Sequence, residues 1–166
     1  MNSIKEQIRS LAEKHFPDVL AMRRHIHMHP ELSYQEVETS SFVAAQLQRL
    51  GLDVKTGIGG YGLTAFIQGK NPDSRLIALR ADMDALPIQE QNTTEYKSKH
   101  DGVMHACGHD VHTSSLLGAA IILNELRDQF EGTIQLVFQP AEEMLPGGAS
   151  LMLKDGVFAN RTPQAI

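Results

Sequence analysis

The spacing of apolar residues changes at Leu52, and this change constrains the fold more than any other feature of the chain. Before Leu52, apolar residues recur at helical spacing over residues 3–15, 17–28 and 34–50. After it come short apolar runs typical of strands, at residues 52–56, 63–67, 75–80 and 133–138. Residues 111–126 form a helical segment with a wide apolar face. Helices that alternate with buried strands predict an α/β sandwich with a mixed sheet, and no internal repeat or linker interrupts it.

Residues with special backbone preferences predict where the helices begin and end. Pro17 suits the first turn of a second helix, so the chain should open with two helices. Ser33 and Glu36 have the spacing of a capping box for the helix over residues 34–50. Gly51 lies where a left-handed C-cap should end that helix.

The second half of the chain supplies the sheet. The strand at 75–80 is apolar enough to be central, a short helix is expected at 147–154, and one more strand starts at 162–166. Spaced glycines at 57–62 formally match a dinucleotide-binding pattern, but that pattern needs a helix behind it and a strand-like segment follows. We therefore expect a hairpin turn there.

Composition excludes several classes of protein. The 166 residues are 42% hydrophobic and 21% charged, which is ordinary for one globular domain. The net charge of −5 with scattered basic residues argues against nucleic acid as a partner. A single cysteine rules out an internal disulfide, the N-terminus lacks an apolar signal sequence, and no apolar run is long enough to span a bilayer. We expect a soluble cytoplasmic protein with no membrane partner.

The segment HACGHD, which begins at His105, holds the only cysteine of the chain. His112 lies just behind it, so three of the 8 histidines fall within this short stretch. Cys107 and His109 are two positions apart, and in a turning loop that spacing points both side chains to one side. A thiolate and an imidazole suit Zn²⁺ and similar ions. Metal binding is favoured over the alternative, a buried free cysteine beside polar loop histidines.

Three other groups of polar residues are candidates for the same site. Glu142 and Glu143 follow a buried strand, where one carboxylate could bind metal while the other moves a proton, or where both form a solvated acidic turn. Asp82 and Asp84 also follow a strand, and serve either a metal site or a turn before a proline. The alternating histidines near Pro30 are interpreted as residues compatible with a helix end, at positions 25, 27 and 29.

Four stretches together resemble the M20 metallopeptidase family, in its amidohydrolase branch of hippurate hydrolases, N-acyl-amino-acid deacylases and auxin-conjugate hydrolases. They are residues 24–33, 79–87, 104–112 and 138–143, in the order that the family has them. The resemblance implies an α/β/α sandwich of the zinc-peptidase type and a site for two divalent ions, with Zn²⁺, Mn²⁺, Co²⁺ and Ni²⁺ all suited to it.

The resemblance also implies roles for individual residues. Cys107, His109 and Glu143 would be metal ligands, with Cys107 shared by or close to both ions. Glu142 would be the general base that takes a proton from the metal-bridging water and returns it to the leaving amine. Asp84 would be the catalytic, orienting aspartate. Residues that would contact the ligands rather than the ions are Asp82, His105 and His112.

Members of this family are more than twice as long as this chain. They add two further histidine ligands and a lid domain that dimerises. We therefore expect residues 1–166 to be the N-terminal part of a catalytic domain without its lid, weak in metal binding and nearly inactive alone. The full-length form should be a homodimer that deacylates N-acyl or N-aroyl amino acids.

Two alternatives remain. One is a non-catalytic, truncated paralogue that binds metal or a partner through an exposed sheet edge. The other is a di- or aminopeptidase of the same family, although the peptidase branches generally carry an aspartate-centred motif in place of Cys-Gly-His-Asp.

Overall fold

The structure, a computed structural model, describes residues 3–166 and contains four helices, a short 3₁₀ turn and four strands within that range. The first half holds α1 (Ile4–Met28), α2 (Val37–Arg49), β1 (Val54–Ile58), β2 (Gly62–Gln68) and β3 (Leu76–Asp82). The second half holds α3 (His109–Glu125), the 3₁₀ turn η1 (Arg127–Gln129), β4 (Thr133–Gln139) and α4 (Gly148–Lys154). Residues 88–102, which the sequence left unassigned, form no helix or strand.

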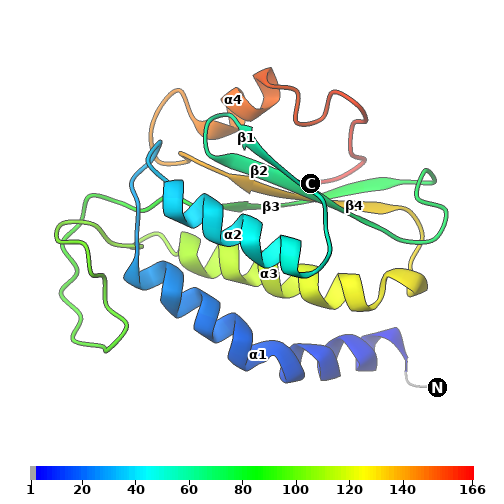
Figure 1. The fold of residues 1–166 in the computed structure, drawn as a ribbon, viewed down its shortest axis with the longest axis horizontal. Coiled ribbons are helices and arrows are strands. Elements are labelled where there is room, and N and C mark those ends of the chain that lie inside the picture. Colours follow the sequence, from blue (N-terminus) through cyan, green and yellow to red (C-terminus); the bar gives the residue numbers. More distant parts are fainter. Residues whose placement is uncertain (1–2) are drawn as a thin grey trace.

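The four strands form one mixed sheet in the order β1-β2-β4-β3. β2 is antiparallel to both of its neighbours, whereas β3 and β4 run parallel. Figure 1 shows α1, α2 and α3 on one side of the sheet and α4 on the other, with α3 between α1 and the strands. The expected α/β sandwich with a mixed sheet is confirmed.

The two faces of the sheet bury separate apolar clusters. The larger cluster lies between the sheet and the three long helices, and its fully buried members include Val43, Leu47, Leu63, Leu117, Leu136 and Phe138. The smaller one lies under α4 and includes Ile58, Ala78, Val137 and Met152. Residues of β3 and β4 contribute to both clusters, which is why apolar side chains are not confined to alternate positions in these two strands.

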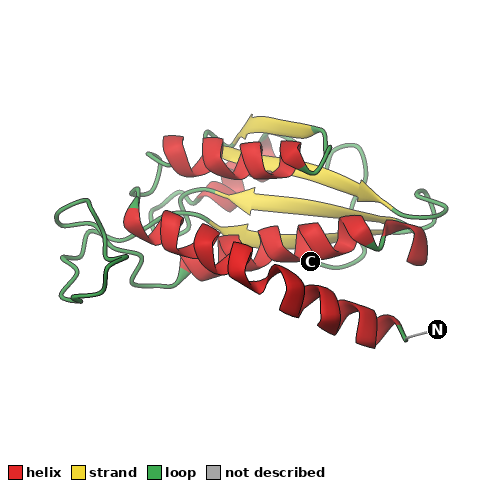
Figure 2. Cartoon of the chain, turned by 60° about the horizontal axis from the view of Figure 1, so that its bottom comes forward, coloured by secondary structure: helices red, strands yellow, loops and turns green. Residues whose placement is uncertain are grey.

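This topology brings three chain segments to one edge of the sheet. The parallel strands β3 and β4 both end there, and α3 begins there. In Figure 2 the loops that follow these strands gather at one end of the molecule. Side chains just after each strand can therefore meet the first turn of α3.

Pro17 does not start a second helix, because α1 continues through it from Ile4 to Met28. A proline in a helix loses one hydrogen bond and crowds the preceding turn. Contacts on both sides of Pro17 outweigh that cost. His15 lies 2.6 Å from the Glu125 carboxylate at the end of α3, and Met22, Ile26 and His27 are buried beyond the proline.

The predicted central position of the strand at 75–80 is also wrong. β3 is one of the two edge strands of the sheet, and its apolar residues contact clusters on both faces. Its outer edge is not bare, since Gln164 N–H donates to the Leu76 carbonyl and Ala78 N–H donates to the Ala165 carbonyl, both at 2.9 Å. The expected strand at 162–166 is therefore a paired segment without regular strand geometry.

Other expectations hold with small shifts. The glycine-rich segment at 57–62 is the β1–β2 hairpin, and Gly51 ends α2 with a φ of 75°.

The predicted capping box of α2 is wrong. This helix begins at Val37 and has no side-chain cap from Ser33 or Glu36. Within residues 3–166 no helix has the length and hydropathy to cross a membrane.

The contact between α1 and α3 depends on a glycine. A Cβ atom at Gly118 would lie 2.8 Å from Cγ2 of Val19, closer than carbon atoms pack. We expect Gly118→Val to lower the free energy of unfolding by about 1–3 kcal/mol, because a stiff branched side chain overpacks the contact. Urea denaturation measures this. Ser115→Val places the same side chain at an exposed position of α3 and should stay within about 0.5 kcal/mol of wild type. Equal losses in both variants would contradict the overpacking.

Candidate functional site

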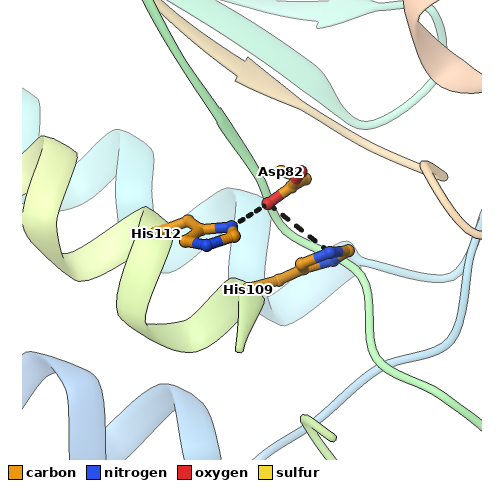
Figure 3. Close-up of side chains that lie close together, drawn as sticks. All are labelled: Asp82, His109 and His112. Carbon is orange, nitrogen blue, oxygen red and sulfur yellow. Dashed lines mark hydrogen bonds and ion pairs between the residues drawn. The ribbon is translucent and has the colours of Figure 1, made fainter. Parts of the chain in front are cut away.

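Three predicted ligands meet at this edge of the sheet. One ligand atom each from Cys107, His109 and Glu143 lie within 4.8 Å of one another. A second group capable of holding a metal shares His109 and adds Asp82 and His112, again within 4.8 Å (Figure 3). The ligands thus come from the end of β3, the start of α3 and the loop after β4.

Gly108, between Cys107 and His109, forms the turn that leads into α3. Its φ of 90° is in the left-handed region, which L side chains rarely adopt. This turn lets the chain enter α3 at His109, and the Gly108 carbonyl accepts the N–H of His112 at 3.1 Å. Cys107 stays exposed just outside the helix while His109 is buried in its first turn.

Asp82 connects both histidines of α3 to the strand end. Its Oδ1 lies 2.7 Å from Nδ1 of His112 and 3.6 Å from Nε2 of His109 (Figure 3). Its Oδ2 accepts a hydrogen bond from Arg80 at 2.7 Å. The predicted contact between Asp82 and ligand residues is therefore present, and His112 reaches it from the exposed side of α3.

Asp84 is almost fully buried and accepts hydrogen bonds from four groups. Oδ2 accepts the Ser33 hydroxyl at 2.5 Å and the Glu143 N–H at 3.0 Å, and the Glu142 N–H also donates to this carboxylate. Oδ1 lies 3.1 Å from Nδ1 of His109. Burial alone would raise the pKa of Asp84, but the hydrogen bonds from His109, Ser33 and the two backbone N–H groups hold it well below its usual range. Asp84 is therefore an anion that solvent does not reach.

Asp84 also fixes which nitrogen of His109 faces the site. Nδ1 lies 2.9 Å from the Asp84 backbone carbonyl, so it carries a proton and donates. Nε2 points to the opposite side, 3.8 Å from Oε1 of Glu143. Burial opposes protonation, yet the Asp84 hydrogen bond and the Asp82 charge raise the pKa of His109. Because Nδ1 keeps its proton, Nε2 is the atom that could bind a metal ion, and binding would require the neutral ring.

Cys107 and Glu143 fit a cation placed between them. Without an ion the Cys107 thiol donates to the Glu143 carboxylate, and this hydrogen bond, with partial burial and the charges of the surrounding acids, raises the pKa of the thiol. A bound divalent ion would reverse that preference, because it would favour the thiolate and screen the repulsion among the acids. The soft sulfur, the imidazole nitrogen and the carboxylate oxygen are a donor set for Zn²⁺ or a similar ion.

Glu142 differs from its neighbour in what it touches. Its backbone N–H points to Asp84, while its side chain is exposed and its charge is among those that raise the pKa of Cys107. It belongs to neither metal-capable group among residues 3–166. Both glutamates are exposed, and they differ in that only Glu143 has a carboxylate oxygen within 4.8 Å of the Cys107 and His109 ligand atoms.

His105 is a buried residue next to the site. Neither of its ring nitrogens has a hydrogen-bond partner among residues 3–166, and burial lowers its pKa to about 4. His105 lies in neither metal-capable group, nor do the histidines near Pro30, at positions 25, 27 and 29.

A polar network supports the first turn of α3 from below. Asp110 is completely buried, and its Oδ2 accepts from Arg23 at 2.9 Å and lies 2.6 Å from Nδ1 of His27. His27 in turn contacts Glu90 at 3.1 Å. Neither Asp110 nor Glu90 was among the residues that the sequence indicated for the site. Asp110 directly follows a ligand candidate, a position where a supporting carboxylate could have been suspected.

Comparison with known proteins agrees with this geometry. The sequence model of peptidase family M20/M25/M40 matches residues 78–166, which include all the candidate ligands. The chain belongs to this family. It is 51% identical over 153 residues to an N-acyl-L-amino acid amidohydrolase of Geobacillus stearothermophilus, covering 92% of this chain and 41% of that one.

Two further similar proteins are described by other activities. A thermostable carboxypeptidase of Saccharolobus solfataricus is 49% identical over 143 residues, covering 84% of this chain and 36% of that one. The crystal structure of Bacillus subtilis YXEP, described as a dinuclear metal-binding peptidase of the M20 family, superposes with a TM-score of 0.84 and 43% identity, covering 90% of this chain and 42% of that one. The chain thus spans about two fifths of the length of these relatives.

The buried charge of Asp84 gives a pH-dependent prediction. Asp84→Asn should lower the free energy of unfolding at pH 7 by about 3 kcal/mol, because an amide places a donor among N–H groups. The folded pKa of Asp84 is depressed, so its stabilising contribution is complete above the unfolded value of about 3.9 and is lost as pH falls through the folded pKa.

Urea denaturation of both proteins between pH 7 and pH 3 measures this difference. The gap between wild type and Asp84→Asn should be constant from pH 7 to about pH 5 and shrink below pH 4. Asp53→Asn, at an exposed position, is the matched control and should show no gap. A gap that does not change with pH would contradict the depressed pKa.

Proposed function

We propose that the protein is a metal-dependent hydrolase that cleaves the amide bond between an acyl group and an amino acid. The observation that carries this proposal is the convergence of Cys107, His109 and Glu143 beside a second glutamate, Glu142, that is free to move a proton. The names of the amidohydrolase and carboxypeptidase relatives support the same reaction class. M20 membership and the dinuclear relative support the use of divalent metal.

The three converging residues would hold the metal, with Cys107 as a thiolate. Zn²⁺, Mn²⁺, Co²⁺ and Ni²⁺ all suit this donor set. A bound divalent ion supplies Lewis acidity and lowers the pKa of coordinated water. Asp84 would orient His109 so that Nε2 faces the ion. Its carboxylate also accepts the backbone N–H groups of Glu142 and Glu143 and so positions their loop.

Glu142 would act as the general base and then the general acid. Its exposed carboxylate would take a proton from the attacking water and return that proton to the nitrogen of the leaving amine. The products would be the carboxylate of the acyl group and the amino acid with its free amine. Because Glu142 and Glu143 are adjacent, one turn of the chain delivers both the base and a ligand.

The substrates we favour are N-acyl or N-aroyl amino acids. The second candidate is removal of the C-terminal residue of a peptide, which the carboxypeptidase relative favours. Both reactions break an amide between an acyl carbon and the nitrogen of an amino acid with a free carboxylate. The candidate site residues would serve either reaction. The two reactions differ in the acyl side of the substrate, which is a simple acyl or aroyl group in the first and the rest of a peptide in the second.

The 166-residue chain alone should turn over little. It supplies one thiolate, one imidazole and one carboxylate as predicted ligands, fewer than two tetrahedral ions require. We therefore expect weak metal binding by this chain and deacylation only by the full-length protein. Hydrolysis by the 166-residue chain at full-length rates would contradict this part of the proposal.

The neighbouring glutamates give a matched pair of variants. Glu142→Gln should keep the metal content of the full-length protein and lower kcat by about 10²–10⁴-fold, because general-base catalysis is lost. Glu143→Gln should lower the metal affinity. Metal analysis after dialysis and steady-state kinetics measure the two effects. The same phenotype in both variants would contradict the division of roles.

A substrate panel tests the reaction itself. The full-length protein, loaded in turn with each of the four metals, is offered N-acetyl and N-benzoyl amino acids, N-blocked dipeptides and dipeptides with a free amine. We expect hydrolysis of the N-acyl amino acids, with N-blocked dipeptides as the mark of the carboxypeptidase alternative. Full metal content without hydrolysis of any compound would overturn the proposed function.

A further inference from the structure

The loop after β4 holds both glutamates in a constrained backbone. Ala141 is buried and has a φ of 46°, a left-handed conformation that costs energy in a residue other than glycine. Its carbonyl accepts the N–H of Gly148 at 2.8 Å, so the loop closes on itself behind Glu142 and Glu143. At Gly148 a Cβ atom would lie 1.8 Å from the Pro140 carbonyl oxygen, which leaves no room for a side chain. Something must hold Ala141 in this conformation.

Glu36 makes that contact. Its Oε1 accepts the Ala141 N–H at 2.7 Å, and its side chain is completely buried. The other oxygen, Oε2, is buried without a hydrogen-bond partner among residues 3–166. Burial raises the pKa of Glu36, although hydrogen bonds from the backbone N–H groups of Ala141, Glu36 and Tyr34 oppose the shift. A buried carboxyl group with an unpartnered oxygen is unfavourable for stability, so stability alone gives no reason for a glutamate here.

Glu36 is not needed to begin α2. The first free N–H groups of that helix are bound by Glu31, whose carboxylate accepts from Glu38 at 3.0 Å and Thr39 at 2.7 Å. The Glu36 side chain makes no cap hydrogen bond. Its carboxyl group is thus directed to the loop of the glutamates and not to its own helix.

Two neighbours of Glu36 contact the same machinery. The Tyr34 hydroxyl donates to the Met144 carbonyl and accepts the Gly147 N–H, both at 3.0 Å, at the far end of the loop. The Ser33 hydroxyl donates to Asp84, which binds the N–H groups of both glutamates. Three side chains within four residues therefore hold the loop at its start, its middle and its end.

We propose that residues 33–36 form a brace that positions Glu142 and Glu143, with Glu36 fixing Ala141 and Tyr34 fixing the far end of the loop. The brace rests on the proposed function for its effect on catalysis, but its effect on the loop does not depend on that function. None of these three side chains is a ligand candidate or carries a proton in the reaction. They act through the backbone of the loop, as positioning residues.

The experiment compares three variants of the full-length protein. E36A removes the contact with Ala141, E36Q keeps an amide oxygen that can accept the same N–H, and E31A removes two hydrogen bonds from the same helix without touching the loop. The readouts are hydrogen exchange of the amides over residues 139–148, Co²⁺ affinity, kcat and KM, and the urea midpoint.

E36A should raise exchange over residues 139–148 about tenfold. It should also weaken Co²⁺ binding and lower kcat about 10²-fold with KM nearly unchanged, because a small displacement of a catalytic group has large effects on rate. E36Q should recover most of the lost kcat. E31A should lower the urea midpoint but leave loop exchange and kcat as in wild type.

Loop exchange and kcat of E36A equal to wild type would overturn the brace, as would an E31A variant with the same loss of kcat as E36A. If E36A does not fold, Tyr34→Phe provides the test at the other end of the loop. Its Gly147 amide should exchange faster, and wild-type exchange there would also overturn the proposal. If the full-length protein hydrolyses nothing on the panel, the proposed function fails, while the exchange measurements still decide the brace.

Discussion

The buried carboxylate of Asp84 is the interaction on which the arrangement of the site depends. It receives N–H groups from the loop after β4, the ring of His109 from α3 and the hydroxyl of Ser33 from the segment before α2. These elements are remote in sequence, and their apolar faces pack without specifying where polar side chains point. A single anion with several donors around it fixes their relative position, because an unpaired donor in this environment would be costly.

The sheet topology makes this meeting of elements possible. β3 and β4 are parallel, so Asp82, Asp84 and the two glutamates leave the sheet at the same edge. That edge is also where α3 begins, and the left-handed turn at Gly108 places Cys107 and His109 on either side of the helix start. The apolar core thus determines which chain segments meet, and the polar contacts determine the direction of each side chain.

Local sequence signals predicted most elements of the fold. The helix after His109, the hairpin at 57–62 and the C-cap at Gly51 depend on periodicity or on a backbone preference within a few residues. The wrong predictions concern features that depend on contacts between residues far apart in the sequence. Pro17 remains inside α1 because α3 contacts the helix on both sides of the proline. The edge position of β3 could not be predicted, because the order of strands in a sheet does not depend on the residues of any one strand. Likewise, the residue types of Cys107, His109 and Glu143 indicated a metal site, but nothing near them in sequence identified Glu36 or Glu90.

Ser33 and Glu36 show why such supporting residues are hard to recognise. Their spacing is that of a capping box, and a helix does follow them, yet both side chains turn away from it. The local rule describes what these residues would do in an isolated segment, where the free N–H groups of the helix are the nearest partners. In the folded chain Glu31 satisfies those groups, so Ser33 and Glu36 are released for contacts about 50 and 100 residues away. A polar residue that departs from its local role at the edge of a site is therefore a candidate for a positioning function.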